Sequence, residues 1–152
     1  MTNRIAILVA TLACIATAST AASAATPAVA TTNVNLRAGP STHFPVVKVV
    51  PAGARLVTFG CVKGYTWCDV SFAGNRGWLA ARYVRLAGPG VVVSPKVAAS
   101  TGIPVVAFNH AYWRTHYTGR PWVGRWPAYA APRRATAEAR ATAPRVRPSE
   151  HR

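Results

Sequence analysis

The sequence predicts a mostly β fold in one small domain, followed by a basic extension. Four or five short apolar or β-branched runs lie at 34–37, 45–50, 55–62, 66–72 and 77–79, and turn residues separate them. Short strands at this spacing are typical of a small sandwich or barrel. After residue 86 the composition shifts to Pro, Gly, Arg and aromatic residues. A packed domain is therefore expected only over the first stretch.

Two glycines predict the tight turns of this domain. Gly64-Tyr65 lies midway between Cys61 and Cys68, and it puts Gly at the first central position of a type II′ turn, where φ is positive. Gly74-Asn75 fits the next hairpin on the same terms. The first turn makes the two cysteines cross-strand neighbours.

Side-chain alternation along the strand after Cys61 predicts which residues face the core. The core side holds Cys68, Val70 and Phe72. The opposite side, which holds Trp67, Asp69 and Ser71, is expected to meet water.

Residues 1–24 have the pattern of a secretory signal peptide. Arg4 lies in a short charged head, an apolar run covers 5–18, and Ala22-Ser23-Ala24 fits a cleavage site. The run is shorter than the roughly 20 residues that span a bilayer, so a membrane anchor is the weaker interpretation. Residues 25–32 are expected to be a plain spacer. The mature chain is then periplasmic or secreted, without a transmembrane segment.

Export leaves two cysteines, because Cys14 is removed with the signal. An even pair in an oxidising compartment suggests a disulfide. The hairpin register puts the Cα atoms of Cys61 and Cys68 roughly 5.5 Å apart, which is the usual disulfide separation. The rival interpretations are a cysteine nucleophile and a metal site, and neither has a histidine nearby in the sequence.

Three motifs resemble the bacterial SH3 domain, the SH3b family. They are Asn-Val-Asn-Leu-Arg-Ala-Gly-Pro-Ser at 33–41, Gly-X-X-Trp-Cys-X-Val at 64–70 and Arg-Gly-Trp-Leu-Ala-Ala-Arg-Tyr-Val at 76–84. The resemblance covers residues 31–87, about a third of the chain. It implies a small SH3-like antiparallel β-barrel that serves as an extracytoplasmic binding module, often on cell-wall peptides. It does not imply catalysis.

The same resemblance suggests where a ligand binds. In SH3b domains the loop after the first strand borders the ligand groove, so Thr42, His43 and Phe44 are candidate groove residues. The alternative for His43 is a solvated loop histidine. Trp67 lies on the predicted polar face with Tyr65 in the adjacent turn, and an exposed aromatic pair is a plausible platform for a peptide or sugar.

Trp78 is expected to pack in the core rather than to contact ligand, since a large aromatic in so small a domain is usually buried. Gly77 before it is expected to let the backbone approach the indole closely.

Beyond the domain, residues 88–108 read as a linker in which Val91 to Val93 could add an edge strand. Residues 109–129 are rich in arginine and aromatic residues. Asn109 is a good N-cap for a short helix at 111–117, which ends at Gly119. This segment resembles a C-terminal extension of some small exported SH3b proteins of Gram-negative bacteria. Residues 130–152 lack apolar bulk and are expected to be disordered.

Two roles stay open for the Arg/aromatic segment. Its rings can dock on the barrel as a tether, or its arginines and rings can form a surface for anionic ligands. Docking is the preferred interpretation. The cations assigned to an anionic surface are Arg114, Arg120, Arg125, Arg133 and Arg134.

The charge balance points to anionic partners. The chain carries 18 Lys and Arg against 3 acids, a net charge of +15 at pH 7, which becomes +14 when Arg4 leaves with the signal. Such a field attracts anionic lipid, lipopolysaccharide phosphates and peptidoglycan carboxylates, and it weakens with salt. Nucleic acid is not an expected partner of an exported protein.

Catalysis is not expected. The three acids are Asp69, Glu138 and Glu150, and two of them lie in the tail, so the paired carboxylates of a glycosidase cannot be assembled. The histidines have no metal-binding spacing, and neither a cofactor nor a metal is predicted. The predicted function is a non-catalytic module that contacts cell-wall peptidoglycan peptide or glycan through the SH3b groove. The alternative is an envelope protein that binds a protein partner, anionic lipid or lipopolysaccharide through its C-terminal segment.

Overall fold

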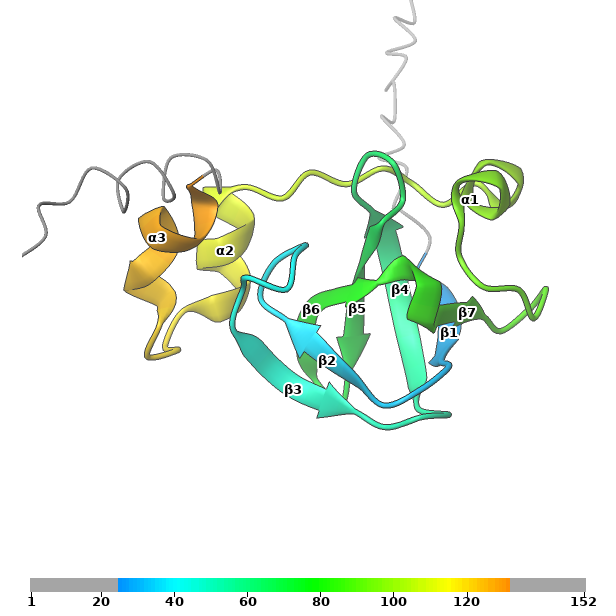
Figure 1. The fold of residues 1–152 in the computed structure, drawn as a ribbon, viewed down its shortest axis with the longest axis horizontal. Coiled ribbons are helices and arrows are strands. Elements are labelled where there is room, and N and C mark those ends of the chain that lie inside the picture. The colour runs from blue at the N-terminus through cyan, green and yellow to red at the C-terminus, as the bar shows by residue number, and fades with distance from the viewer. Residues whose placement is uncertain (1–24, 132–152) are drawn as a thin grey trace, which may run out of the picture.

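Seven strands follow one another in the computed structural model, which describes residues 25–131. They are β1 (Thr26–Ala30), β2 (Val34–Arg37), β3 (Val46–Val50), β4 (Arg55–Cys61), β5 (Trp67–Phe72), β6 (Asn75–Ala80) and β7 (Val84–Leu86), with a 3-10 turn, η1 (Ala81–Tyr83), before the last. The sheet order is β3-β2-β6-β5-β4-β1-β7, and neighbouring strands are antiparallel. Figure 1 shows the sheet wrapping around on itself. The predicted signal peptide and the predicted disordered tail after Ala131 lie outside the described residues.

Strand β1 corrects the prediction that residues 25–32 are a spacer. It pairs with both β4 and β7, and Ala28 and Ala30 are buried in the core. Small side chains suit this position because they let neighbouring strands pack closely. Alanine and proline are uncommon in strands, so the composition of this stretch did not indicate one.

The two hairpins keep the predicted strand pairing but differ in their turns. Cys61 faces Cys68, as expected. The type II′ assignment is wrong, because Gly64 and Tyr65 both have positive φ, and the amide of Tyr65 donates to the carbonyl of Val62. In the next hairpin Phe72 faces Asn75, so the turn residues are Ala73 and Gly74. Both have positive φ, as in a type I′ turn.

The disulfide between Cys61 and Cys68 is present, with a Cα separation of 3.9 Å. This is shorter than the predicted 5.5 Å. Cys61 directs both of its backbone groups away from β5, since its amide donates to the Pro104 carbonyl and its carbonyl accepts from the Val106 amide. The cysteines are therefore a non-hydrogen-bonded pair, the closer of the two antiparallel pair types.

The predicted core face of β5 is confirmed. Cys68 and Val70 are fully buried with Leu36, Leu79 and Leu86, and Phe72 packs against the same cluster.

Gly77 lets β2 and β6 approach each other. A side chain there would meet the carbonyl oxygen of Arg37 and the side chain of Leu36, each 2.7 Å from the added Cβ. The predicted close approach of the backbone to the Trp78 indole stays a prediction.

The segment after β7 contains a helix that the linker prediction missed, α1 (Pro95–Thr101). Ser94 caps its first turn, Pro95 occupies the start, where proline is tolerated, and Gly102 ends it with φ of 68°. Val92 makes only an isolated bridge to Arg85, so the possible edge strand is reduced to one residue pair. The chain then crosses the β4 end at Cys61 and Val105 (Figure 1).

The last part of the described chain forms α2 (His110–Tyr117), the 3-10 turn η2 (Val123–Arg125) and α3 (Trp126–Ala130). Asn109 caps α2, as predicted, with its side chain accepting the Tyr112 amide at 2.9 Å. Figure 1 shows α2 and α3 together at one side of the barrel, opposite α1. Among the described residues, no helix has the length and hydropathy needed to cross a membrane.

Candidate functional site

The chain from Phe108 to Ala130, which we call the C-terminal segment, covers the outward face of β5 and β6. Trp78 on β6 is fully buried, with its ring centroid 5.5 Å from that of Phe108 and 5.3 Å from that of Tyr112. The expected packing role of Trp78 is therefore confirmed, but its partners come from outside the barrel.

Asp69 lies under the same cover. It faces Trp78 across the strand pair and is 2% exposed, which contradicts the prediction that its side of β5 meets water. Both carboxylate oxygens accept from the Arg76 guanidinium at 2.6 Å, and Oδ1 also accepts from the Tyr112 hydroxyl at 2.6 Å. A buried carboxylate needs such partners, because burial of an unpaired charge is costly. Asp69 thereby ties α2 to the barrel.

Burial sets the protonation of the groups around Asp69. It raises the pKa of Tyr112, and the neighbouring Tyr117 and the Asp69 carboxylate raise that pKa further. Burial also raises the pKa of Tyr117. For Arg76, burial acts to lower the pKa, but the hydrogen bonds and charge of Asp69 outweigh it and the pKa is raised. Tyr112 therefore remains a neutral hydroxyl donor, and Arg76 remains charged.

A second contact joins the segment to the loop between β2 and β3. The Phe44 ring lies 5.1 Å from Phe108, 6.0 Å from Trp113 and 5.9 Å from Tyr129. Phe44 and Trp113 are both buried, and they form a second apolar cluster with Ala38 and Tyr117. The preferred docking interpretation of the aromatic segment is confirmed by these contacts.

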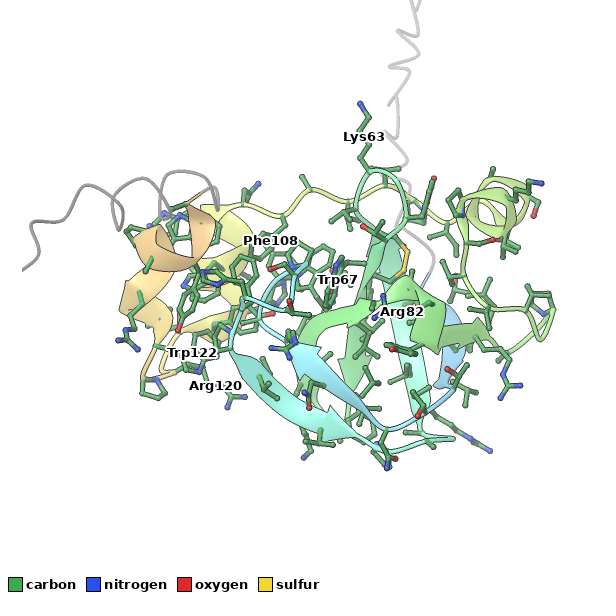
Figure 2. All side chains as sticks on the ribbon, viewed as in Figure 1. Lys63, Trp67, Arg82, Phe108, Arg120 and Trp122 are labelled. Carbon is green, nitrogen blue, oxygen red and sulfur yellow. A yellow bond between two sulfur atoms is a disulfide. The ribbon has the colours of Figure 1, made fainter. Side chains whose placement is uncertain are left out.

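Beside this covered face, Trp67 lines an open hollow of about 410 Å³. Its walls come from β2, β5, the end of β6 and η1, and from the loops beside β2. The lining residues are Thr32, Asn33, Val34, Asn35, Arg37, Thr42, Trp67, Ala80, Arg82 and Tyr83. We call this the Trp67 hollow. Figure 2 shows Trp67 between Phe108 and Arg82 in this view.

Two arginines give the Trp67 hollow its charge. Arg37 donates to the carbonyls of Thr42 and Phe44, at 3.0 and 2.9 Å, and so holds the loop between β2 and β3 in shape. Arg82 is exposed and its guanidinium lies 4.6 Å from the Tyr83 ring centroid. Arg82 is thus positioned to meet an anionic group.

The structure separates some of the predicted groove residues. Trp67 is half-buried in the hollow, but Tyr65 packs against the barrel core and donates to the Ile103 carbonyl at 3.4 Å. Tyr65 lines a different hollow, beside Ser94 and Pro95. His43 is exposed, whereas Phe44 is covered by the C-terminal segment. The expected pair of Tyr65 and Trp67 is not one platform.

The arginines that were predicted to bind an anionic surface do not all have the same exposure. Arg114 and Arg125 are exposed, while Arg120 is half-buried and donates to the Asn75 side chain at 3.0 Å. Arg133 and Arg134 lie outside the described residues. Within residues 25–131, no three His, Cys, Asp or Glu side chains gather in a way that could hold a metal ion.

Sequence reasoning missed Arg82 and Tyr83 as members of the site. Both lie in the motif at 76–84, where the alternation of a strand gives way to η1 and no longer indicates which side chain faces outward.

The geometry is thus that of a small antiparallel barrel with an aromatic hollow on its side. The family model of the bacterial SH3 domain matches residues 32–85, and this stretch of the chain is a bacterial SH3 domain. Such domains are binding modules, often cell-wall related and often extracytoplasmic. Comparisons with curated proteins and with solved structures gave no match.

Proposed function

We propose that the protein is a non-catalytic module of the cell envelope that binds peptidoglycan peptide through the Trp67 hollow. The observation that carries the proposal is the placement of Arg82 at the edge of a hollow whose wall is Trp67. The membership of residues 32–85 in a family of binding modules supports it.

The chemistry of the hollow suits a short peptide with free carboxylates. Trp67 and Tyr83 offer apolar ring surface, Asn33 and Asn35 offer amide donors and acceptors, and Arg82 offers a charged donor pair. A few polar groups in an aromatic hollow are typical of small-ligand sites. Peptidoglycan stem peptides carry such carboxylates.

The acidic residues of the described chain support the non-catalytic part of the proposal. Asp69 is the one Asp or Glu within residues 25–131, and it is buried and bonded to Arg76 and Tyr112. A general acid or base must reach a substrate proton, and Asp69 is buried and does not line the Trp67 hollow.

The alternative binding surface, on the C-terminal segment, offers only positive charge to a ligand. The rings of the C-terminal segment are used in packing, so the exposed cations Arg114 and Arg125 act without an aromatic platform. Binding of anionic lipid or lipopolysaccharide by such residues is long-range and falls with salt.

Pull-down with purified peptidoglycan sacculi tests the proposal. The matched pair of variants is Arg82→Ala and Arg85→Ala, because both remove one exposed arginine and only the first lines the hollow. At about 0.5 M salt the Debye length is roughly 4 Å, so distant charges no longer contribute. We expect binding to persist at this salt, to fall at least tenfold for Arg82→Ala, and to be unchanged for Arg85→Ala.

Two results would contradict the proposal. Equal losses for both variants would mean that net charge drives binding. Loss of all binding at about 0.5 M salt, together with binding to anionic vesicles at low salt, would instead assign function to the exposed arginines of the C-terminal segment.

A further inference from the structure

A second hollow of about 430 Å³ adjoins the Trp67 hollow. The two share Trp67 and Thr42, so the Trp67 side chain forms the boundary between them. The remaining lining residues of the second hollow are Ser41, His43, Tyr129 and Ala131. We call it the Tyr129 hollow. A ligand that crosses Trp67 would occupy both.

The Tyr129 hollow is built jointly by the barrel and the C-terminal segment. Ser41, Thr42 and His43 come from the loop between β2 and β3, whereas Tyr129 and Ala131 come from α3 and the residue after it. The segment therefore does more than cover the barrel, because it extends the groove beyond the SH3 domain.

Tyr129 is held in place before any ligand arrives. Its ring centroid lies 5.7 Å from that of His43, 5.9 Å from that of Phe44 and 5.8 Å from that of Trp113. A polar contact of 3.3 Å between Nε2 of His43 and the Ala128 carbonyl joins the loop to α3. A preformed wall lowers the entropic cost of ligand binding.

The two hollows differ in chemistry. The Trp67 hollow is lined by Arg37 and Arg82, while the residues that line the Tyr129 hollow supply hydroxyls, an imidazole and two further aromatic rings and include no Lys or Arg. Hydroxyl groups beside aromatic rings suit an uncharged ligand with an apolar face and a hydroxylated rim. A pyranose ring has this form.

From this difference we propose that the Tyr129 hollow is a sugar subsite. The protein then binds the junction of peptidoglycan, where a stem peptide is attached to a sugar of the glycan strand. The sugar occupies the Tyr129 hollow and the peptide carboxylates lie toward Arg82. This inference rests on the proposed function, to which it adds the glycan portion of the ligand and a role for the C-terminal segment.

Isothermal titration calorimetry with three soluble ligands tests it: the free stem tripeptide, the N-acetylated disaccharide, and the disaccharide that carries the tripeptide. Occupation of two linked subsites by one ligand strengthens binding without new contacts at either. We expect the disaccharide-tripeptide to bind the full chain at least tenfold more tightly than the tripeptide.

Two variants test whether the added affinity for the disaccharide-tripeptide comes from the Tyr129 hollow. Tyr129→Ala and His43→Ala should each reduce the affinity for the disaccharide-tripeptide to that of the tripeptide and leave tripeptide binding unchanged. Arg82→Ala should weaken both peptide-containing ligands. Both variants remove contacts between the barrel loop and α3, so near-ultraviolet circular dichroism checks that α3 keeps its packing in each. A variant that keeps this packing and loses only the added affinity for the disaccharide-tripeptide supports the sugar subsite.

The outcomes separate the two proposals. Equal affinity for tripeptide and disaccharide-tripeptide, or equal loss of all ligands in His43→Ala, would overturn the sugar subsite and leave the proposed function standing. Absence of binding to all three ligands would overturn both.

Discussion

The hydroxyl of Tyr112 donates to Oδ1 of Asp69 at 2.6 Å, across 43 positions of sequence. This bond joins α2 to the middle of the barrel, and the Arg76 guanidinium completes the carboxylate's set of partners. It is the polar centre of an otherwise aromatic contact between the SH3 domain and its C-terminal segment.

Tyr112→Phe should destabilise the protein by about 1.5–3 kcal/mol, since hydrogen bonds to charged groups contribute that much. Urea unfolding measures the change. Tyr65→Phe is the matched control, because it removes the same atom from a longer bond, 3.4 Å to the Ile103 carbonyl, and should cost less than about 1 kcal/mol. Equal costs for the two variants would show that the bond to the Asp69 carboxylate is no stronger than a bond to a neutral carbonyl.

Reduction of the disulfide should lower the melting temperature without unfolding the barrel at room temperature. The bond between Cys61 and Cys68 closes a short loop, with a sequence separation of 7, so the entropic model gives about 2–3 kcal/mol. Thiol titration of the chain without residues 1–24, which removes Cys14, should find no free thiol until reductant is added. Two reactive thiols in the folded protein would contradict the pairing.

Gly60→Ala should be far more costly than Gly53→Ala, although both glycines have positive φ. A Cβ at Gly60 would lie 2.6 Å from the Val106 side chain and 2.7 Å from the Pro104 carbonyl, whereas one at Gly53 would meet nothing within 4 Å. Backbone strain alone costs about 1–3 kcal/mol. Thermal melts should show the larger loss at Gly60, and similar losses would mean that the 104–106 crossing contributes little.

Alkaline pH should disrupt the contact between the barrel and the C-terminal segment. The pKa values of Tyr112 and Tyr117 are raised in the folded state by burial, so their neutral forms stabilise the fold below the ordinary tyrosine pKa of about 10. Above that pH the unfolded chain releases these protons and the folded chain keeps them, so stability falls as pH rises. Tyrosinate absorbance followed with circular dichroism should show both ionising only as the fold is lost. Complete ionisation in a native fold would contradict the burial.

Strands β2 to β6 could be predicted because their apolar runs, glycine turns and alternation agree. The family resemblance located the same domain. Strand β1 could not be predicted, because its Ala28 and Ala30 become core residues only through contact with β4 and β7.

The site was harder to predict, because its residues also depend on contacts between distant parts of the chain. Alternation correctly put Asp69 on the outer face of its strand, but it carries no information on what covers that face. Phe108 and Tyr112 cover it, and nothing in the local pattern near Asp69 points to them. Tyr129 enters the groove through the same docking, so a site built from two distant segments was seen only in part.

The chain has five tryptophans, Trp67, Trp78, Trp113, Trp122 and Trp126, and each indole N–H gives its own signal in a proton–nitrogen correlation spectrum. Their environments differ, because Trp67 lines both hollows, Trp78 and Trp113 are fully buried, and Trp122 and Trp126 belong to the C-terminal cluster.

Titration of this spectrum with the disaccharide-tripeptide at about 0.5 M salt tests the central claim most directly, with Trp67→Phe used to assign its indole. We predict that the Trp67 signal shifts in proportion to ligand bound while the signals of Trp78 and Trp113 stay in place. Shifts confined to Trp122 and Trp126 with Trp67 unchanged would contradict the account and would place binding on the C-terminal segment.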